Sequence, residues 1–396
     1  MTINASSLRG NWSFPTTIWF GAGRISTLAR ACRTLGISRP FLVTDPGLAK
    51  LPMVKDTIAS LEADGVPLTL FSEMKPNPIS RNVFDGVAAL RAAGCDGVIA
   101  FGGGSSLDAG KAIALMATQP EDGIDIWSME EGRKDWQSAA TPLPILAIPT
   151  TAGTGSEVGR SSVVLNEETG QKVIVTHPGM MPGIVIADPE LTLGLPPLIT
   201  AATGMDALAH CLEAYCSPFH NPLCDGIALE GMLLVRQHLQ DAVSDGSDII
   251  ARSQMMAAAA MGATAFQKGL GAIHAMSHPI GALYDTHHGL TNAVVMPYVL
   301  LRNREAIEEK LSRISAYLGL TDSPSQGFQS FVEWTLELRS AFDIPHTTTE
   351  LGVEESQLDG LAEAATVDPT ALANPVRLDV AGFRALFEKA QTGDLS

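Results

Sequence analysis

Four of the nine histidines in the chain lie within one sixteen-residue stretch, HAMSHPIGALYDTHHG. His274 and His278 are four residues apart, the spacing at which two imidazoles on one helix face reach the same metal ion. His287 and His288 are adjacent, so their side chains point in different directions. Pro279 disfavours ideal helical geometry at the residue before it, which weakens the pairing of His274 with His278. The spacing indicates a metal site without deciding which histidines form it.

A second candidate cluster lies upstream in ITAATGMDALAHCLEAYC, where Asp206 and His210 fall on one face of a predicted helix, one turn apart. Alone, such a pair is typical of a simple hydrogen bond. With His274 and either His278 or His288 it gives one carboxylate and three imidazoles. That mixed set suits Fe(II), zinc or another first-row divalent ion, and excludes calcium and magnesium, which prefer all-oxygen shells. Ligand type alone leaves iron and zinc both open.

A glycine-rich segment, DGVIAFGGGSS, predicts a strand, a tight turn at 102–105 and a helix beginning near Ser106. Free backbone N–H groups and the positive end of a helix dipole suit a pyrophosphate, and glycines let the ligand approach the backbone. The loop in IPTTAGTGSE follows another buried strand, and its hydroxyls and amides either wrap a ribose or phosphate or form a simple turn. The first segment is a candidate phosphate site, and the second stays open between nucleotide contact and a simple turn.

Asp45 ends the predicted strand PFLVTD, and two interpretations of it stay open. A carboxylate at a strand end accepts from a ribose 2′-hydroxyl and repels a 2′-phosphate, which favours NAD over NADP. The same side chain also suits a turn cap before Pro46 and Gly47. Upstream, FGAGRIS reads G-x-G but carries Ser26 where the dinucleotide fingerprint needs glycine or alanine, so we interpret it as a structural turn.

The elements that must position these residues change character near residue 195. From 40 to 190 short apolar runs alternate with helical stretches, which predicts a parallel sheet covered on both faces. Two further β-rich runs, SSVVLN and QKVIVT, are joined by EETG, whose glycine suits a hairpin turn. After GLPP the chain is rich in Ala, Leu, Met, Glu and Gln at helical periodicity. We therefore predict an α/β domain at 1–194 and an all-helical domain at 195–396.

The amino-acid composition limits the classes of binding partner. A net charge of −17 leaves no basic stripe for nucleic acid or anionic lipid, so a small molecule is the expected partner. No stretch offers ~18 uninterrupted apolar residues for a membrane span, and the N-terminus lacks the pattern of a secretory signal. The five cysteines have no CxxC spacing, which argues against a disulfide framework and a thiolate zinc site. These features predict a cytoplasmic protein with reduced, buried thiols.

Four motifs in order, GGGSSLDAGKA, PTTAGTGSE, GMDALAHCLEAY and HAMSHPIGALYDTHHG, resemble the iron-containing (group III) alcohol dehydrogenases over essentially the whole chain. The resemblance implies a Rossmann-like dinucleotide-binding domain followed by an all-α metal-binding, catalytic domain, as in dehydroquinate synthase-like folds. It implies reversible hydride transfer between an alcohol and NAD, with NADP less favoured. The alcohol, aldehyde or ketone oxygen would bind a divalent metal, Fe2+ first, with zinc or another divalent ion as the alternative.

The resemblance also assigns residues. It makes Asp206, His210, His274 and His288 the metal ligands, and gives His278 a catalytic role in proton relay or substrate contact. Residues implied in cofactor binding are Asp45, Asn77, Gly103, Gly104, Ser105, Asp108, Thr150, Thr151, Thr154, Lys172, Leu191 and Gly194.

This sequence departs from the family pattern at three positions. His287 stands where many members have proline, and its role is left open. Thr370 and Val376, in VDPTALANPVRL, differ from common versions, so substrate preference does not transfer.

Two other functions keep the same fold: a metal- and NAD-dependent lyase of the dehydroquinate synthase type, and a non-catalytic member. For assembly, the apolar, β-like FPTTIWFG near the N-terminus predicts an edge strand that pairs with a neighbouring chain. With the family's habit of forming dimers or larger assemblies, we expect a homodimer or larger homo-oligomer.

Overall fold

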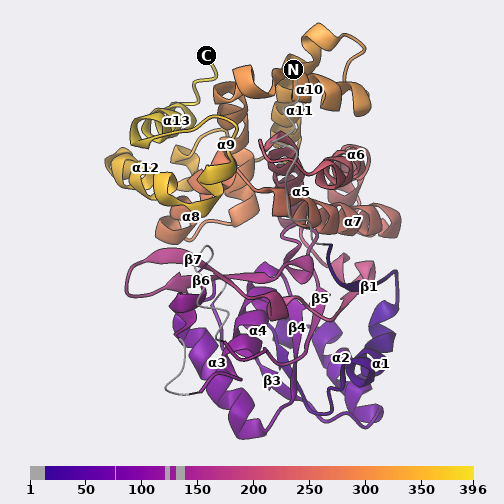
Figure 1. Cartoon of the computed structure of the whole chain (residues 1–396). Helices are drawn as coiled ribbons and strands as arrows, with labels where there is room; N and C mark the ends of the chain where they lie inside the picture. Colours follow the sequence, from indigo (N-terminus) through magenta and orange to yellow (C-terminus); the bar gives the residue numbers. More distant parts are fainter. Residues whose placement is uncertain (1–13, 76, 121–124, 131–138) are drawn as a thin grey trace. The chain divides into compact units, whose positions relative to one another are not determined.

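The computed structural model describes residues 14–75, 77–120, 125–130 and 139–396. By its internal contacts this part of the chain divides into two compact units, one of Pro15–Gly194 and one of Leu195–Ser396 together with Phe14. The first unit contains the described strands, and the second is helical (Figure 1).

The first unit is built on a six-stranded sheet in the order β1-β8-β5-β4-β2-β3, in which every neighbouring pair is parallel. Its strands are β1 (Thr17–Phe20), β2 (Pro40–Val43), β3 (Thr69–Phe71), β4 (Gly97–Gly102), β5 (Ile145–Pro149) and β8 (Ile184–Ala187). The chain runs from β2 outward to β3, then returns to β4 on the other side of β2. The order therefore reverses between β2 and β4, the kind of point at which doubly wound sheets bind nucleotides.

Helices cover both faces of this sheet, as the alternation of strands and helices predicted (Figure 1). Successive side chains of a strand point to opposite faces, so Phe41 and Val43 pack with helices α3 and α4, whereas Leu42 packs with α1 and α2. The helices are α1 (Leu28–Leu35), α2 (Pro52–Ala63), α3 (Ser80–Ala93) and α4 (Gly104–Met116). The α/β fold class is confirmed; α4 begins two residues before the predicted Ser106.

A separate antiparallel hairpin follows the loop after β5. Strands β6 (Ser161–Asn166) and β7 (Gln171–Thr176) pair along their whole length. Gly170 closes the turn with φ of 69°, a left-handed conformation that glycine adopts without steric cost. The hairpin that EETG predicted is confirmed.

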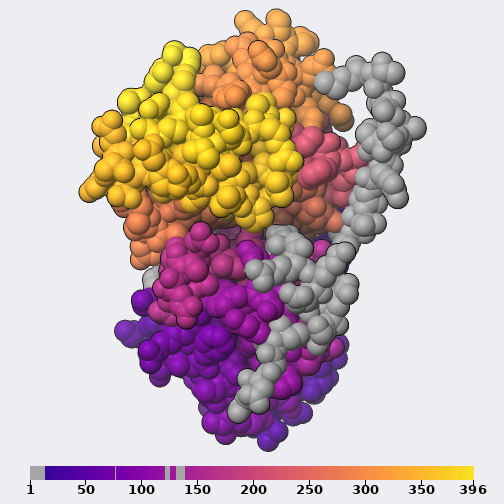
Figure 2. Space-filling view, turned by 60° about the vertical axis from the view of Figure 1, so that its left-hand side comes forward, coloured from indigo at the N-terminus to yellow at the C-terminus, as the bar shows by residue number. Residues whose placement is uncertain are grey.

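The second unit contains helices α5 to α13. Their bounds are α5 (Pro197–Cys216), α6 (Pro222–Ser244), α7 (Ile249–Ala265), α8 (Ala272–Tyr284), α9 (His288–Arg302), α10 (Arg304–Tyr317), α11 (Gly327–Ala341), α12 (Leu358–Val367) and α13 (Val380–Thr392). Helix α5 is buried on all sides from Thr200 to Cys216, because α6, α7 and α9 pack around it. On the surface of this unit, α12 and α13 pack together and form the yellow face in Figure 2.

Helix α8 corrects one expectation. Pro279 was predicted to disturb helical geometry at His278, yet α8 runs through it from Ala272 to Tyr284. A proline inside a helix removes one N–H donor, a loss that tertiary packing can offset. Here α9, α12 and the short helix η13 (Pro369–Ala373) pack against α8 and hold it. His274 and His278 thus lie on the same helix, with ring centroids 5.9 Å apart.

Two expectations from composition can be compared with the structure. Within the described residues, none of the helices has the length and apolar character that a membrane span requires. All five cysteines are free thiols, and all but Cys95 are buried.

Candidate metal and nucleotide sites

Four side chains of the helical unit converge on one point: Asp206 and His210 from α5, His274 from α8 and His288 from the first turn of α9. One potential ligand atom from each lies within 4.8 Å of all the others. Asp206, His210 and His274 are buried, and His288 is half-buried. The structure therefore brings together the set that the family resemblance named, with His288 rather than His278 as the last member.

Asp206 Oδ1 is the centre of this cluster. It lies 3.7 Å from His210 Nε2, 3.9 Å from His274 Nε2 and 3.7 Å from His288 Nε2. A carboxylate oxygen and three imidazole nitrogens at such spacing form a mixed N/O donor set suited to Fe(II), zinc and related ions.

The hydrogen bonds around the cluster show that it fits a cation. Asn292, one turn after His288 on α9, donates to Asp206 Oδ1 at 2.8 Å. The same amide nitrogen lies 3.3 Å from His274 Nε2 and 3.2 Å from His288 Nε2. One amide group has only two protons, so it cannot serve all the converging lone pairs. An acceptor-rich, buried cluster of this kind is what a divalent ion neutralises.

A glycine explains how α9 comes close enough to α5. A Cβ at Gly289 would lie 2.2 Å from the carbonyl oxygen of Ala202 and 3.0 Å from Asp206 Cβ. Any larger residue would push the start of α9 away from α5. His288, the preceding residue, would then no longer reach Asp206.

His278 is held by a different partner. Its Nδ1 lies 2.8 Å from Asp368 Oδ2, and its ring stacks on that of His288 with centroids 5.5 Å apart. Burial acts to raise the pKa of Asp368, but the charge and hydrogen bond of His278, with hydrogen bonds from Thr370, lower it overall. Asp368 therefore stays ionised and fixes the ring of His278 beside the cluster.

Glu213 holds the back of His274. Its Oε2 lies 2.5 Å from His274 Nδ1, so an ionised Glu213 accepts a hydrogen bond from Nδ1–H and leaves Nε2 facing the cluster. Burial acts to lower the pKa of His274, but the charge and hydrogen bond of Glu213, together with the charges of Asp206 and Asp368, raise the pKa overall.

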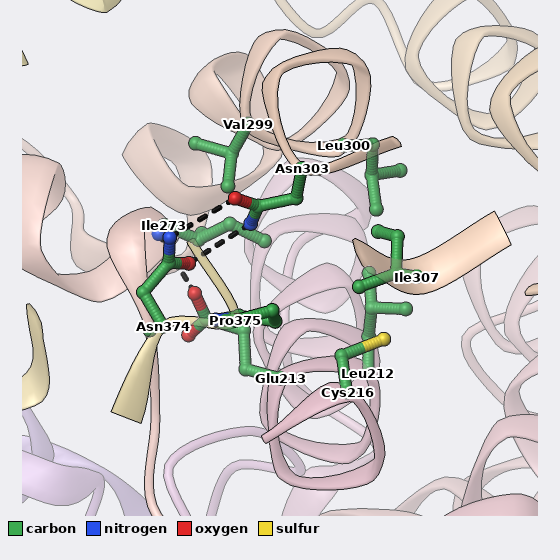
Figure 3. A pocket seen from close by; sticks show the side chains of 11 residues that line it. Leu212, Glu213, Cys216, Ile273, Val299, Leu300, Asn303, Ile307, Asn374 and Pro375 are labelled. Carbon is green, nitrogen blue, oxygen red and sulfur yellow. Dashed lines mark hydrogen bonds between the residues drawn. The ribbon is translucent and has the colours of Figure 1, made fainter. Parts of the chain in front are cut away.

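Beside Glu213, a small pocket is lined by residues of α5, α8, α9 and α10 together with Asn374 and Pro375. Asn303 and Asn374 face each other on its wall (Figure 3).

The nucleotide candidates gather at one edge of the sheet in the α/β unit. Parallel strands end on the same side, so residues following β2, β4 and β5 are neighbours there. Asp45 follows β2, the Gly103–Ser105 turn follows β4 and the Thr150–Thr154 loop follows β5. Gly103 is the N-cap of α4, so the positive end of the helix dipole lies at this turn. An ideal Cβ on Gly104 would lie 2.7 Å from Thr154 Cγ2, so the two loops touch.

Asp45 and Asp108 both have structural partners. Asp45 Oδ1 accepts from the amides of Gly47 and Leu48 at 2.8 and 2.9 Å, which is the turn cap. Asp108 accepts from Ser156 Oγ and from the amide of Val163, and so anchors the hydroxyl-rich loop and the hairpin to α4. The sequence predicted cofactor contact for both residues. The contacts of Asp108 indicate that it positions the loop and the hairpin, whereas Asp45 can be a turn cap or a cofactor contact.

The remaining cofactor candidates divide into two groups. Lys172 on the hairpin donates to Asn77 Oδ1 at 3.0 Å, so these two predicted residues lie together. Leu191 is buried in the core cluster of α1 and α2, which is a packing position. An ideal Cβ on Gly194 would meet no atom within 4 Å.

Two ambiguous motifs have structural explanations. His287 is the N-cap of α9, where its Nδ1 accepts from the amide of Leu290. In FGAGRIS the amides of Gly23 and Ile25 donate to the carboxylate of Asp188 at 3.1 and 2.9 Å. Those amides are occupied by a protein side chain, which is the arrangement of a structural turn.

Sequence reasoning missed three residues beside the cluster: Glu213, Asn292 and Asp368. Glu213 follows Asp206 and His210 at the i, i+4, i+7 spacing of one helix face, so the sequence alone could have placed it beside them. Asn292 similarly lies one turn after His288. Asp368, in contrast, is ninety residues from His278, and only the fold brings them together.

Comparison with known proteins places the chain. The family model "Iron-containing alcohol dehydrogenase" matches residues 15–189, and "Fe-containing alcohol dehydrogenase family, C-terminal" matches residues 200–391. The chain belongs to the iron-containing alcohol dehydrogenase family. It is therefore an oxidoreductase by family, with the fold that its sequence predicted.

Individual members of the iron-containing alcohol dehydrogenase family match along nearly their whole length. A 4-hydroxybutyrate dehydrogenase of Cupriavidus necator is 38% identical over 95% of this chain and 98% of its own. The crystal structure of a 1,3-propanediol oxidoreductase, 36% identical, superimposes with a TM-score of 0.91 over 96% of this chain and 100% of that one. A sulfoacetaldehyde reductase from Bifidobacterium kashiwanohense, solved in complex with NAD+, is 28% identical, with a TM-score of 0.87 over 98% of this chain and 100% of that one.

Proposed function

We propose that this protein is a divalent-metal- and NAD-dependent alcohol dehydrogenase. The observation that carries the proposal is the convergence of Asp206, His210, His274 and His288 within 4.8 Å in a buried, acceptor-rich cluster. These four residues would hold the metal, with Fe2+ favoured by the family and zinc as the alternative. The 195–396 domain is then the metal-binding, catalytic domain, and 1–194 the dinucleotide-binding domain.

A divalent cation in this cluster would supply Lewis-acid activation of an alcohol hydroxyl, and NAD would accept the hydride. The protein's own contribution is to orient donors and move the proton. With Nδ1 of His278 engaged by Asp368, Nε2 is the nitrogen that can accept a proton released near His288. A positioned histidine is the side chain that most often carries such a proton transfer.

For the cofactor, we assign the pyrophosphate to the turn at Gly103, Gly104 and Ser105, at the start of α4. Thr151 and Thr154 lie beside that turn, in the loop that Thr150 begins at the carboxyl end of β5. Asp45, at the end of β2, would accept from the adenosine ribose and so favour NAD over NADP. Lys172 and Asn77 would contact the nicotinamide side, whereas Leu191 and Gly194 would contribute shape.

The substrate class follows from the relatives. 4-Hydroxybutyrate and 1,3-propanediol are primary alcohols with a second polar group a few carbons away, and sulfoacetaldehyde is an aldehyde with a charged end. We propose small alcohols of this bifunctional kind, and their aldehydes, as substrates.

The test uses protein purified without oxygen, with its metal content measured. A panel of 4-hydroxybutyrate, 1,3-propanediol, ethanol and 1-butanol is then assayed with NAD+ and NADP+. We expect NADH to accumulate at 340 nm only in metal-loaded protein, and the bifunctional alcohols to give the higher kcat/KM. A lyase of the dehydroquinate synthase type would consume substrate without net NADH, and a non-catalytic member would bind without turnover; either result rejects the proposal.

We also propose that two copies associate through β1. Among the described residues this strand forms one edge of the sheet beside β8, and it exposes Ile18 and Phe20. An exposed apolar edge strand favours pairing with another chain, and a twofold axis would pair two β1 strands antiparallel. Light scattering after size exclusion should give at least a dimer, and Ile18→Lys should lower the mass to a monomer. An unchanged mass would place the interface elsewhere.

The free thiols bear on location. Five cysteines without a disulfide suit a reducing compartment, which supports the cytoplasm as the proposed location.

A further inference from the structure

The N-terminus of α8, which carries His274, is capped in an unusual way. Its N-cap residue is Gly271, which has no side chain to offer. The first two amides of the helix instead donate to side chains from elsewhere: Ala272 N to Asn374 Oδ1 at 3.1 Å and Ile273 N to Glu213 Oε1 at 2.7 Å. A Cβ at Gly271 would lie 2.9 Å from Glu213 Oε1, so the glycine leaves room for this capping.

Glu213 and Asn374 differ in what else they touch. Glu213 uses its second oxygen to hold His274 Nδ1 at 2.5 Å. Asn374 instead exchanges hydrogen bonds with Asn303 at 2.9 and 3.0 Å, on the pocket wall drawn in Figure 3. Both residues therefore cap α8, but only Glu213 reaches the ring of a candidate metal ligand.

Glu213 can also compensate charge at the metal centre. With a divalent ion, one carboxylate and three neutral imidazoles, the cluster would carry one net positive charge, which is costly to bury. Glu213 is 6% exposed and lies on the same face of α5 as Asp206 and His210. A carboxylate at this position would offset that charge.

Resting on the function proposed above, we propose that Glu213 is the positioning residue of the metal centre. It fixes the proton of His274 on Nδ1, turns Nε2 toward Asp206 and supplies the compensating charge. A carboxylate behind a histidine ligand makes the imidazole a stronger donor and fixes its orientation.

The test is metal affinity measured without turnover. Glu213→Gln keeps an oxygen for the amide of Ile273 but replaces the charged acceptor of His274 by an amide NH2. Competition with a chromophoric chelator should show Co2+ and Zn2+ bound about 10- to 100-fold more weakly than by the parent. The visible spectrum of the Co2+ form should also change, because the orientation of one imidazole is lost.

Asn374→Ala is the matched control, because it removes the other side-chain cap of α8 without touching His274. It should lower Tm yet keep a Co2+ affinity and spectrum close to those of the parent. The inference is overturned if Glu213→Gln binds Co2+ with the parent's affinity and spectrum, or if Asn374→Ala weakens binding as much as Glu213→Gln does. His274→Ala distinguishes failure of this inference from failure of the proposed function. If the parent binds no more metal than this variant, the proposed metal-dependent function fails.

Discussion

The two candidate sites of this protein differ in whether side chains or backbone groups form them. The cluster in the helical unit is made of side chains: four donors come from three helices, Glu213 and Asn292 hydrogen-bond to members of that set, and Asp368 holds the neighbouring His278. The sheet edge in the α/β unit is made largely of backbone, and several of its polar side chains, including Asp108, are occupied in holding loops. The difference predicts all-or-none responses to substitution in the first site and graded responses in the second.

The largest effect is expected for His274→Ala. Removing one of four converging donors leaves the cation underliganded in a buried site, so metal should be lost and kcat/KM should fall by about 10³-fold or more. Metal analysis and turnover with a responsive alcohol measure both. His238→Ala, a half-buried histidine of α6 outside the cluster, is the control and should keep both properties. Full activity in a metal-free His274→Ala protein would remove the cluster from the mechanism.

His278→Asn should separate proton handling from metal binding. Because Asp368, and not the donor cluster, holds His278, this variant should retain its metal while kcat falls by about 10²-fold, the usual loss when a general base is removed. Asp368→Asn should lower kcat less, since it disturbs only the orientation of the ring. Loss of metal in His278→Asn would mean that His278, and not His288, belongs among the ligands.

This contrast also explains what the sequence revealed. Parallel-sheet alternation, the hairpin at EETG and the helical second half are local patterns, and the structure agrees with each. Asp206 and His210 are readable because one helix face holds both. Choosing between His278 and His288 required the fold, because that choice depends on Asp368, which tertiary structure brings from ninety residues away. Asp45 stayed ambiguous since a turn cap and a ribose acceptor need the same side chain.

In the α/β unit, the buried carboxyl group of Glu157 is expected to make stability depend on pH. It is buried in the loop after β5, and burial raises its pKa to about 7, against smaller lowering by its backbone hydrogen bond and Lys111. A carboxyl whose pKa is higher in the folded state binds more protons there, so stability falls as pH rises from about 4.5 to about 7. Glu157→Gln should flatten that dependence and stabilise the protein at pH 8 by about 2 kcal/mol, a Tm rise of several degrees.

The measurement for Glu157 is Tm by circular dichroism between pH 5 and pH 8. Glu168→Gln, at an exposed position in the hairpin turn, is the control and should leave the pH profile of the parent in place. A Glu157→Gln protein whose Tm still declines over this range would show that another group is responsible.

Gly104→Ala probes the backbone-built site directly. The added Cβ would lie 2.7 Å from Thr154 Cγ2 and 3.0 Å from Thr154 Oγ1, so the two loops must move apart at the proposed pyrophosphate position. The KM for NAD should rise about tenfold while metal content stays unchanged, because the backbone approach is impaired and not abolished. Gly360→Ala in α12, where a Cβ meets no atom within 4 Å, controls for the substitution itself. An unchanged KM would argue against cofactor contact at this turn.

The smallest effect is expected for Asp45→Ser, which separates the two interpretations of that residue. Serine can still accept from the amides of Gly47 or Leu48, but it removes the charge that would repel a 2′-phosphate. The ratio of kcat/KM with NADP to that with NAD should therefore rise several-fold, on the order of one screened charge interaction. Asp96→Ser is the matched control, because Asp96 caps the amides of Ser38 and Arg39 in the same way but at the opposite, amino end of β4. If both variants lose stability and neither changes the cofactor ratio, Asp45 is a turn cap alone and cofactor choice is made elsewhere at the sheet edge.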